Sequence, residues 1–168
     1  MASDGEVPRL NDLAREAGVG VGTVYRHFPT TAELAVALVE GELERFRALV
    51  EEAAVDPDLD RAVGRLLRES VALVVERPLV AKALLAAPAA VEAIEARIGS
   101  VLARARTAGA VRPDLTIDDV RRLACGIELA ARAGPSPRAA AARYAEIIVA
   151  GVRPAAPKRR VATARKAR

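Results

Sequence analysis

Side chains that can donate hydrogen bonds to a polar partner are concentrated in one short stretch near the N-terminus. Within five positions the chain places Thr23, Tyr25, Arg26 and His27, its only histidine. Hydroxyl and imidazole groups can each donate to a phosphate oxygen, and an arginine can make a bidentate contact to guanine. No nucleophile is spaced to meet a base, and no phosphate-binding loop or metal-ligand cluster occurs elsewhere. The sequence therefore predicts a binding protein that is not an enzyme, with no catalytic residues, cofactor or metal.

The residues before and within this stretch have the spacing of a helix-turn-helix. Segment 9–28 opens with an apolar helical face, and Ala14, Gly18 and Val24 follow at intervals of four and six residues. In a helix-turn-helix the small residue lets two helices approach closely, and the glycine takes the left-handed conformation of the turn. The later aliphatic residue holds the second helix, which can then lie in the major groove of double-stranded DNA.

Composition favours a globular, all-α protein. The chain has 168 residues, of which 52% are hydrophobic and 29% charged, enough for one domain or for a small head joined to a larger body. Aromatic residues make up only 2%, so Ala, Val and Leu must fill the core, which helices tolerate best. No run approaches the roughly 20 apolar residues of a membrane span, and residues 1–6 do not look like a signal peptide. With its single cysteine, the sequence predicts a cytoplasmic protein that does not enter a membrane.

Apolar residues recur every three or four positions along most of the chain, and strand alternation is nearly absent. Two capping boxes and a Ser-Pro pair mark helix starts: Thr30 with Glu33, Thr116 with Asp119, and Ser136 with Pro137. The expected elements are a continuous helix from about 31 to 55, a helix that stops at Pro78, a short apolar segment 79–87, a helix closed by Gly109, and helices over 117–133 and 137–151. The predicted architecture is a helix-turn-helix head followed by a bundle of about five helices.

The run LAREAGVGVGTVYRHFPTTAEL, residues 13–34, resembles the DNA-binding head of the TetR family of regulators. The segment AGAVRPDLTIDDVRRLACGIELA is similar to later helices of many members, so the resemblance covers roughly residues 9–152. It implies a TetR-like all-α fold in three parts: residues 1–50 as the helix-turn-helix head and start of a connecting helix, 51–152 as a ligand-binding and dimerisation domain, and 153–168 as a basic disordered tail.

The resemblance also implies which residues contact DNA. Those on the groove-facing side of the recognition helix are Val21, Gly22, Thr23 and Arg26; those at positions that usually touch phosphates are Tyr25, His27 and Thr31. A bidentate contact from Arg26 to guanine would contribute about 1–3 kcal/mol of discrimination. Two alternatives stay open, in which His27 covers the turn into the next helix and the ring of Tyr25 packs in the core.

The head departs from the family pattern in two respects. Thr31 stands where most members have a basic residue, and the family's first helix is absent, because only nine residues precede Leu10. Residues 1–31 hold three arginines against four acidic residues, a net charge of −1. The apolar faces at Leu13, Val24 and Leu34 are therefore expected to lack a partner. We favour a true start upstream of Met1 over a natural truncation that dimerises but binds DNA weakly.

For the body, the resemblance implies a small-molecule effector and a homodimer formed by the helices near 117–133 and 137–151. These helices are rich in small residues that permit close packing, although packing within one subunit favours the same residues. The candidate effector-binding residues, each equally compatible with plain core, are Leu66, Val74, Leu84, Leu85, Ile94, Ile98 and Leu102. Cys125 is interpreted as a small buried hydrophobe rather than a redox switch.

The function implied by the resemblance is a ligand-responsive repressor that binds a palindromic operator as a dimer, with activation left open. One alternative is a family member that dimerises or binds a small molecule without gripping DNA specifically. Another is non-specific binding of nucleic acid through residues 153–168, which hold seven basic residues and no acid. The remaining 152 residues hold 19 basic against 22 acidic side chains, a net charge of −3. The overall net charge of +4 is therefore due to residues 153–168.

Overall fold

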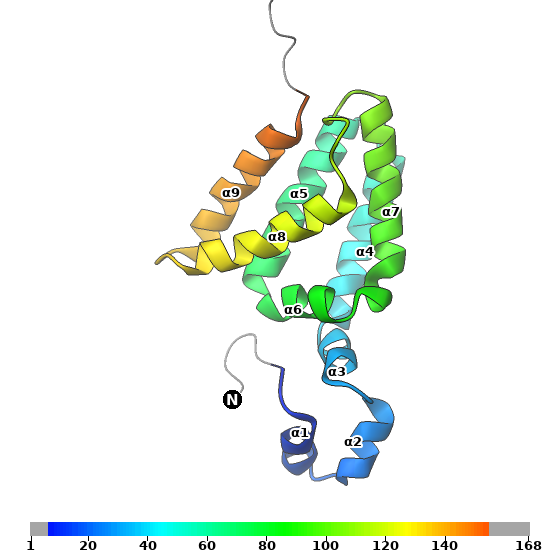
Figure 1. The fold of residues 1–168 in the computed structure, drawn as a ribbon, viewed down its shortest axis with the longest axis vertical. Coiled ribbons are helices and arrows are strands. Elements are labelled where there is room, and N and C mark those ends of the chain that lie inside the picture. The colour runs from blue at the N-terminus through cyan, green and yellow to red at the C-terminus, as the bar shows by residue number, and fades with distance from the viewer. Residues whose placement is uncertain (1–6, 155–168) are drawn as a thin grey trace, which may run out of the picture.

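The computed structural model describes residues 7–154, apart from the side chains of residues 88–90, and that part of the chain is entirely helical (Figure 1). The helices are α1 (Leu10–Ala17), α2 (Val21–His27), α3 (Thr31–Leu38), α4 (Glu40–Val55), α5 (Leu59–Glu76), α6 (Pro78–Ala86), α7 (Pro88–Thr107), α8 (Ile117–Arg132) and α9 (Pro137–Val152). Helices α1 and α2 form a small head, and α3 leads from it to a body built of α4 to α9 (Figure 1). The predicted all-α architecture is confirmed, with six body helices rather than about five within the described range.

The head has a small hydrophobic core of its own. Gly18 joins α1 to α2 in the left-handed conformation (φ 67°), as the glycine signal predicts. Ala14 is fully buried, and it packs with Leu10, Val24 and Leu34 in one cluster that Leu13 partly covers. The expectation that Leu13, Val24 and Leu34 lack a partner is therefore wrong, because Leu34 of α3 joins the residues of α1 and α2 in this cluster and Leu13 packs against it.

The connection between head and body differs from the continuous helix expected over residues 31–55. The Thr30 side chain accepts from the backbone N–H of Glu33, so the helix starts where the capping signal places it. Val39 then leaves the helical conformation (φ −115°, ψ 12°), and a second helix starts at Glu40. Val39 is buried in the body core. The Val39 side chain packs in that core, and the helix divides at this residue into α3 and α4. Local periodicity does not reveal this tertiary contact.

Helix α5 is the centre of the body. Apolar residues are buried on most of its circumference, and one polar stripe that includes Arg61, Arg65 and Glu69 stays exposed. Helices α4, α6, α7, α8 and α9 all pack against it (Figure 1). Gly64 of α5 faces Val149 of α9, and a methyl group at Gly64 would make an ordinary contact with it, at 3.7 Å. The largest fully buried side chains of this core are valines with one leucine, namely Leu43, Val50, Val71, Val74, Val80, Val91 and Val101.

The later helix ends agree with the sequence signals except at one cap. Thr116 and Asp119 form the complete capping box at the start of α8, and Gly109 closes the turn after α7 with a positive φ of 70°. Pro137 occupies the first turn of α9 as predicted, but the Ser136 side chain makes no capping hydrogen bond. The proline already supplies the helical φ and needs no donor satisfied, so the helix begins without the serine's help.

Of the seven basic residues assigned to the C-terminal tail, only Arg153 lies within the described residues. Its guanidinium makes two hydrogen bonds with Asp60 on α5, at 2.9 and 2.7 Å, and this pairing lowers the pKa of the Asp60 carboxyl. Arg153 is therefore engaged with the body. The other six cations, and the disordered tail predicted from them, lie outside the residues that the structure describes. No helix in the described part of the chain is long and apolar enough to span a bilayer.

Candidate nucleic-acid interface and ligand cavity

Helix α2 is anchored on one side and open on the other. Val24 is buried in the head core, whereas Val21 and Tyr25 are 47% and 46% exposed, with Gly22 and Arg26 exposed beside them. Positions 21, 22, 25 and 26 fall on one side of a helix, because 25 and 26 follow 21 and 22 after about one turn. The exposed ring of Tyr25 is thus not a core side chain, and the alternative that placed it in the core is removed.

The other predicted DNA contacts lie around this open face. Thr23 is half-buried at the edge of α2, and Thr31 is exposed in the first turn of α3. His27 is exposed at the end of α2, with its ring 6.5 Å from that of Phe28 at the turn into α3. The structure thus brings six of the seven candidate residues together on α2, with Thr31 on the next helix.

The charge of the head is partly neutralised by a local ion pair. Arg15 contacts Asp12 at 2.9 Å across one turn of α1, and both side chains are largely exposed. Arg26, in contrast, is exposed and has no acidic partner within the described residues. Sequence reasoning did not single out Val19, which is exposed in the turn next to Val21. The sequence that could have indicated Val19 is GVGVG, because the glycines on either side of the two valines leave the valine side chains exposed. An exposed aliphatic side chain can contact the methyl group of thymine.

A small cavity of about 50 Å³ lies among helices α4 to α8 of the body. Four of the seven candidate effector-binding residues line it: Val74, Leu84, Ile94 and Ile98. Leu66 and Leu102 are buried elsewhere in the core, and Leu85 is 60% exposed on α6. The rest of its lining, which sequence reasoning missed, consists of Leu43, Phe46, Ser70, Leu73, Val80, Val91, Glu95, Ile117, Val120 and Arg121.

The polar residues that line this cavity, which we call its polar corner, are Ser70 on α5, Glu95 on α7 and Arg121 on α8. Arg121 contacts Glu95 at 3.2 Å and Asp118 at 2.5 Å, and the Ser70 hydroxyl donates to the carbonyl of Leu66. The hydrogen bond with Asp118, together with the charge of Glu95, raises the pKa of the Arg121 guanidinium. A signal was present in the sequence, because Arg121 follows Ile117 and Val120 and precedes Ala124 on the apolar stripe of its helix.

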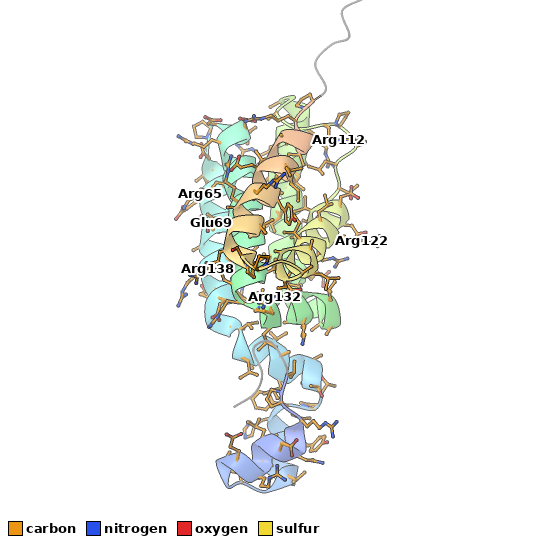
Figure 2. All side chains as sticks on the ribbon, turned by 90° about the vertical axis from the view of Figure 1, so that its left-hand side faces the viewer. Arg65, Glu69, Arg112, Arg122, Arg132 and Arg138 are labelled. Atoms are coloured by element: carbon orange, nitrogen blue, oxygen red, sulfur yellow. The ribbon has the colours of Figure 1, made fainter. Side chains whose placement is uncertain are left out.

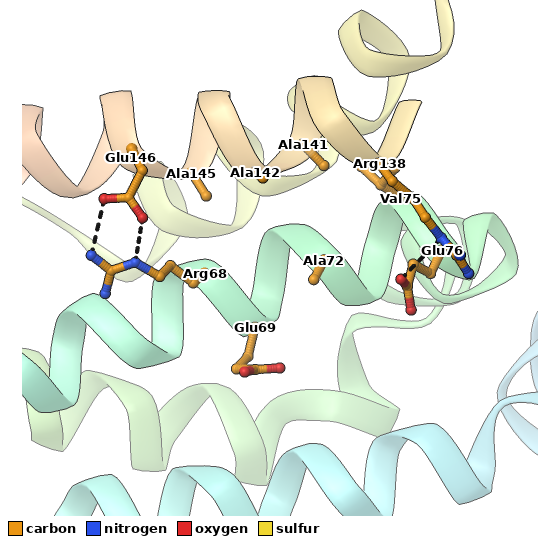
Figure 3. A pocket seen from close by; sticks show the side chains of 10 residues that line it. All are labelled: Arg68, Glu69, Ala72, Val75, Glu76, Arg138, Ala141, Ala142, Ala145 and Glu146. Carbon is orange, nitrogen blue, oxygen red and sulfur yellow. Dashed lines mark hydrogen bonds and ion pairs between the residues drawn. The ribbon is translucent and has the colours of Figure 1, made fainter. Parts of the chain in front are cut away.

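A second hollow, about 310 Å³ in volume, is an open groove between α5 and α9 (Figure 3). Alanines at 72, 141, 142 and 145 form its floor. Arg68 and Glu146 form a two-pronged ion pair at one end, with distances of 2.6 and 3.0 Å, and Arg138 contacts Glu76 at 3.3 Å at the other (Figure 3). These charges already satisfy one another, so we interpret the groove as space left by small residues where two helices pack.

The outer face of α8 and α9 carries apolar side chains that nothing in the described chain covers. Leu123 and Leu129 on α8 and Ile147 on α9 are exposed, Leu129 by 74%. With α9 toward the viewer, Arg112, Arg122, Arg132 and Arg138 lie around this face (Figure 2). An apolar centre with a polar rim is the arrangement of protein–protein interfaces. Cys125 of α8 is only half-buried, and burial raises the pKa of its thiol, which disfavours the reactive thiolate.

An exposed second helix held by a buried aliphatic residue, on a head attached to a larger helical body, defines a helix-turn-helix DNA-binding regulator. Residues 9–38 match the family described as bacterial regulatory proteins, tetR family, and residues 43–154 match the SbtR-like C-terminal domain of transcriptional regulators. The chain belongs to the TetR family and is a DNA-binding transcriptional regulator with an SbtR-like C-terminal domain. Proteins of this family are regulators rather than enzymes.

A solved structure supports this assignment over nearly the whole chain. The chain is similar to the TetR transcriptional regulator SCO0520 from Streptomyces coelicolor, with 29% identity and a TM-score of 0.57. The likeness covers 92% of this chain and 92% of that one, so it includes both the head and the body. None of the curated proteins matches the chain.

Proposed function

We propose that the chain is a ligand-responsive repressor that binds a palindromic operator as a homodimer. The observation that carries the DNA-binding part is the open face of α2, where Val21, Tyr25 and Arg26 are exposed opposite the buried Val24. A helix fixed in this way can enter the major groove with its polar side chains toward base edges and phosphates. Arg26 and Val21 then read bases, while Tyr25 and His27 donate to phosphates and set the register.

Replacing Arg26 by alanine is expected to weaken binding to the protein's own upstream DNA by about five- to 150-fold, since a bidentate contact to guanine is worth about 1–3 kcal/mol. Tyr25→Phe should weaken specific and non-specific binding by the same factor, because a phosphate contact carries no sequence information. That factor should be smaller than the one for Arg26→Ala. Titration of labelled DNA at a fixed moderate salt concentration measures both.

The control for this experiment is Arg65→Ala, which removes an arginine of the same charge from α5. Its partner is Glu52, at 2.7 Å, and both side chains are more than half exposed, so little stability depends on the pair. Operator affinity should stay at the wild-type value. Equal losses in Arg26→Ala and Arg65→Ala would mean that only the net charge matters, and sequence-specific reading by α2 would be rejected.

The homodimer is supported by the uncovered apolar face of α8 and α9. Small residues such as Gly126 and Ala130 let two pairs of helices approach closely, and the exposed leucines and Ile147 supply the apolar area. A twofold dimer through this face places two copies of α2 on the same side of the assembly. Each copy reads one half-site, and half-sites one turn of DNA apart give a palindromic operator.

An arginine in place of Ile147 is expected to convert the dimer into a monomer, because it buries an unpaired charge in each half of a self-complementary contact. Sedimentation or light scattering at micromolar concentration measures the change, and operator binding should fall with it. Val55→Arg is the matched control: Val55 is 76% exposed at the end of α4, away from α8 and α9. A variant at 147 that kept the wild-type mass would exclude this face as the dimer contact.

Ligand response is supported by the position of the cavity relative to the head. Leu43 and Phe46 of α4, and Val80 and Leu84 of α6, form one side of its wall. Helix α6 packs against α3, which carries the head, and α4 follows directly from α3. A ligand that prefers a wider cavity displaces these walls and changes the spacing of the two heads. It lowers operator affinity by the ratio of its affinities for the two states.

A further inference from the structure

The cavity inside the body is too small for an ordinary ligand in the state described here. Its volume is about 50 Å³. An engineered apolar cavity of about 150 Å³ is large enough to bind benzene. A ligand must therefore enlarge this cavity as it enters. The wall is apolar over α4, α6 and most of α7, so the enlarged site receives an apolar body.

Charge at the polar corner limits which head group such a ligand carries. Arg121 lies between Glu95 and Asp118, and Asp118 also contacts Arg122 at 2.8 Å, so two positive charges face two negative ones. The corner is therefore neutral, and each of its charges already has a partner. An anionic ligand would be placed in a partly buried site without a free cation to pair with, which is unfavourable. A cationic ligand would compete with Arg121 for partners that hold it at 3.2 and 2.5 Å.

One buried polar atom at the corner has no hydrogen-bond partner among the described residues, and it is a donor. One terminal nitrogen of Arg121 bonds Glu95 and the other bonds Asp118, whereas its Nε, which is buried from solvent, has no acceptor among the described residues. The hydrogen of the Ser70 hydroxyl goes to the Leu66 carbonyl at 2.7 Å. A buried donor without an acceptor is costly, so an oxygen placed near Nε is stabilising.

We propose that the effector is a small, uncharged molecule with an apolar body and an acceptor oxygen, such as a ketone, whose oxygen accepts a hydrogen bond from the Arg121 Nε–H. This inference rests on the proposed ligand response and specifies its chemistry. The apolar part lies against the aliphatic walls, and the oxygen completes the hydrogen bonding of Arg121 without disturbing its two ion pairs.

The test uses four probes of nearly equal size on the full chain: acetophenone, ethylbenzene, benzoate and 1-phenylethylamine. Acetophenone should bind at least tenfold more tightly than each of the others, because a hydrogen bond from a charged donor is worth about that factor. NMR titration of the ¹⁵N-labelled protein should show one arginine Nε–H resonance shifting with acetophenone. That resonance is identified by its absence from the Arg121→Lys protein.

Arg121→Lys keeps the positive charge for Glu95 and Asp118 but removes the Nε–H donor. This substitution should lower the affinity for acetophenone about tenfold and change the affinity for ethylbenzene less than twofold. Arg122→Lys is the control on the same helix, since Arg122 also contacts Asp118, at 2.8 Å, but does not line the cavity. It should leave both affinities unchanged.

Three outcomes overturn the proposal. The first is tighter binding of benzoate or 1-phenylethylamine than of acetophenone, and the second is no binding of acetophenone. The third is an equal loss of affinity for acetophenone and ethylbenzene in the Arg121→Lys protein. Operator affinity of the ligand-free protein is measured in parallel. Intact operator binding with any of these three outcomes rejects the ligand assignment alone. Absence of operator binding by a ligand-free protein that still binds acetophenone rejects the proposed repressor function and leaves the ligand assignment standing.

Discussion

Aspartate in place of Val24 is expected to unfold the head, abolish operator binding and leave the body folded. Val24 is buried in a cluster that contains only three other buried side chains, Leu10, Ala14 and Leu34. Burying a carboxylate without a partner costs several kcal/mol, which is more than so small a cluster supplies. Operator affinity should fall by about 100-fold or more, since each 1.4 kcal/mol is a factor of ten.

Circular dichroism and a thermal melt distinguish this outcome from general unfolding. The Val24→Asp protein should lose the helical signal of α1 and α2 and keep the main transition, because the body has a separate core. Val55→Asp, at a largely exposed position on α4, should match the wild type in both signals. If the variant at 24 lost its main transition as well, the head and body would be one cooperative unit.

Truncation of Leu43 to alanine is expected to give the largest loss of stability among single substitutions in the body. Leu43 is fully buried at the start of α4 and also lines the cavity. Leucine-to-alanine changes in such positions cost about 2–5 kcal/mol, through lost burial and the space left behind. For a chain of this size each kcal/mol lowers Tm by about 2–4 °C, so a fall of roughly 5–20 °C is expected.

Leu85→Ala is the matched control, because it is the same chemical change at an exposed site. Leu85 is 60% exposed on α6, and its truncation should alter the free energy of unfolding by less than about 0.5 kcal/mol. Urea titration followed by circular dichroism measures both variants. Similar midpoints for Leu43→Ala and Leu85→Ala would contradict the packing described here.

The head was predictable because its determinants are close in sequence. Gly18 takes the left-handed turn and Thr30 caps the next helix, each as the local pattern predicts. Val24 holds α2 as the helix-turn-helix spacing predicts, although the short N-terminal segment had suggested that it lacked a partner. The break at Val39 was not predictable from the same reasoning. It depends on the body core that Val39 joins, and helical periodicity runs through the position without interruption.

The cavity was only partly predictable, for a similar reason. Apolar residues at helical spacing identify a buried face but do not say which of its members border empty space. Leu66 and Val74 belong to the same stripe of α5, yet only Val74 lines the cavity. The polar corner requires Ser70, Glu95 and Arg121 to meet from three helices, and that meeting is a property of the tertiary packing.

Helix α3 belongs to both parts of the molecule, because neighbouring residues on it enter different cores. Leu34 is buried in the head cluster, while Ala35 and Val39 are buried in the body core. Successive residues of a helix point about 100° apart, so α3 packs against the head on one side and against the body on another. A chimeric regulator that takes a new DNA-reading segment from another family member would therefore need its junction on the body side of Val39. The imported segment must also present residues matching Ala35 of α3 and Val39 at its end, and transplanting the recognition helix alone would leave Leu34 facing an unmatched surface.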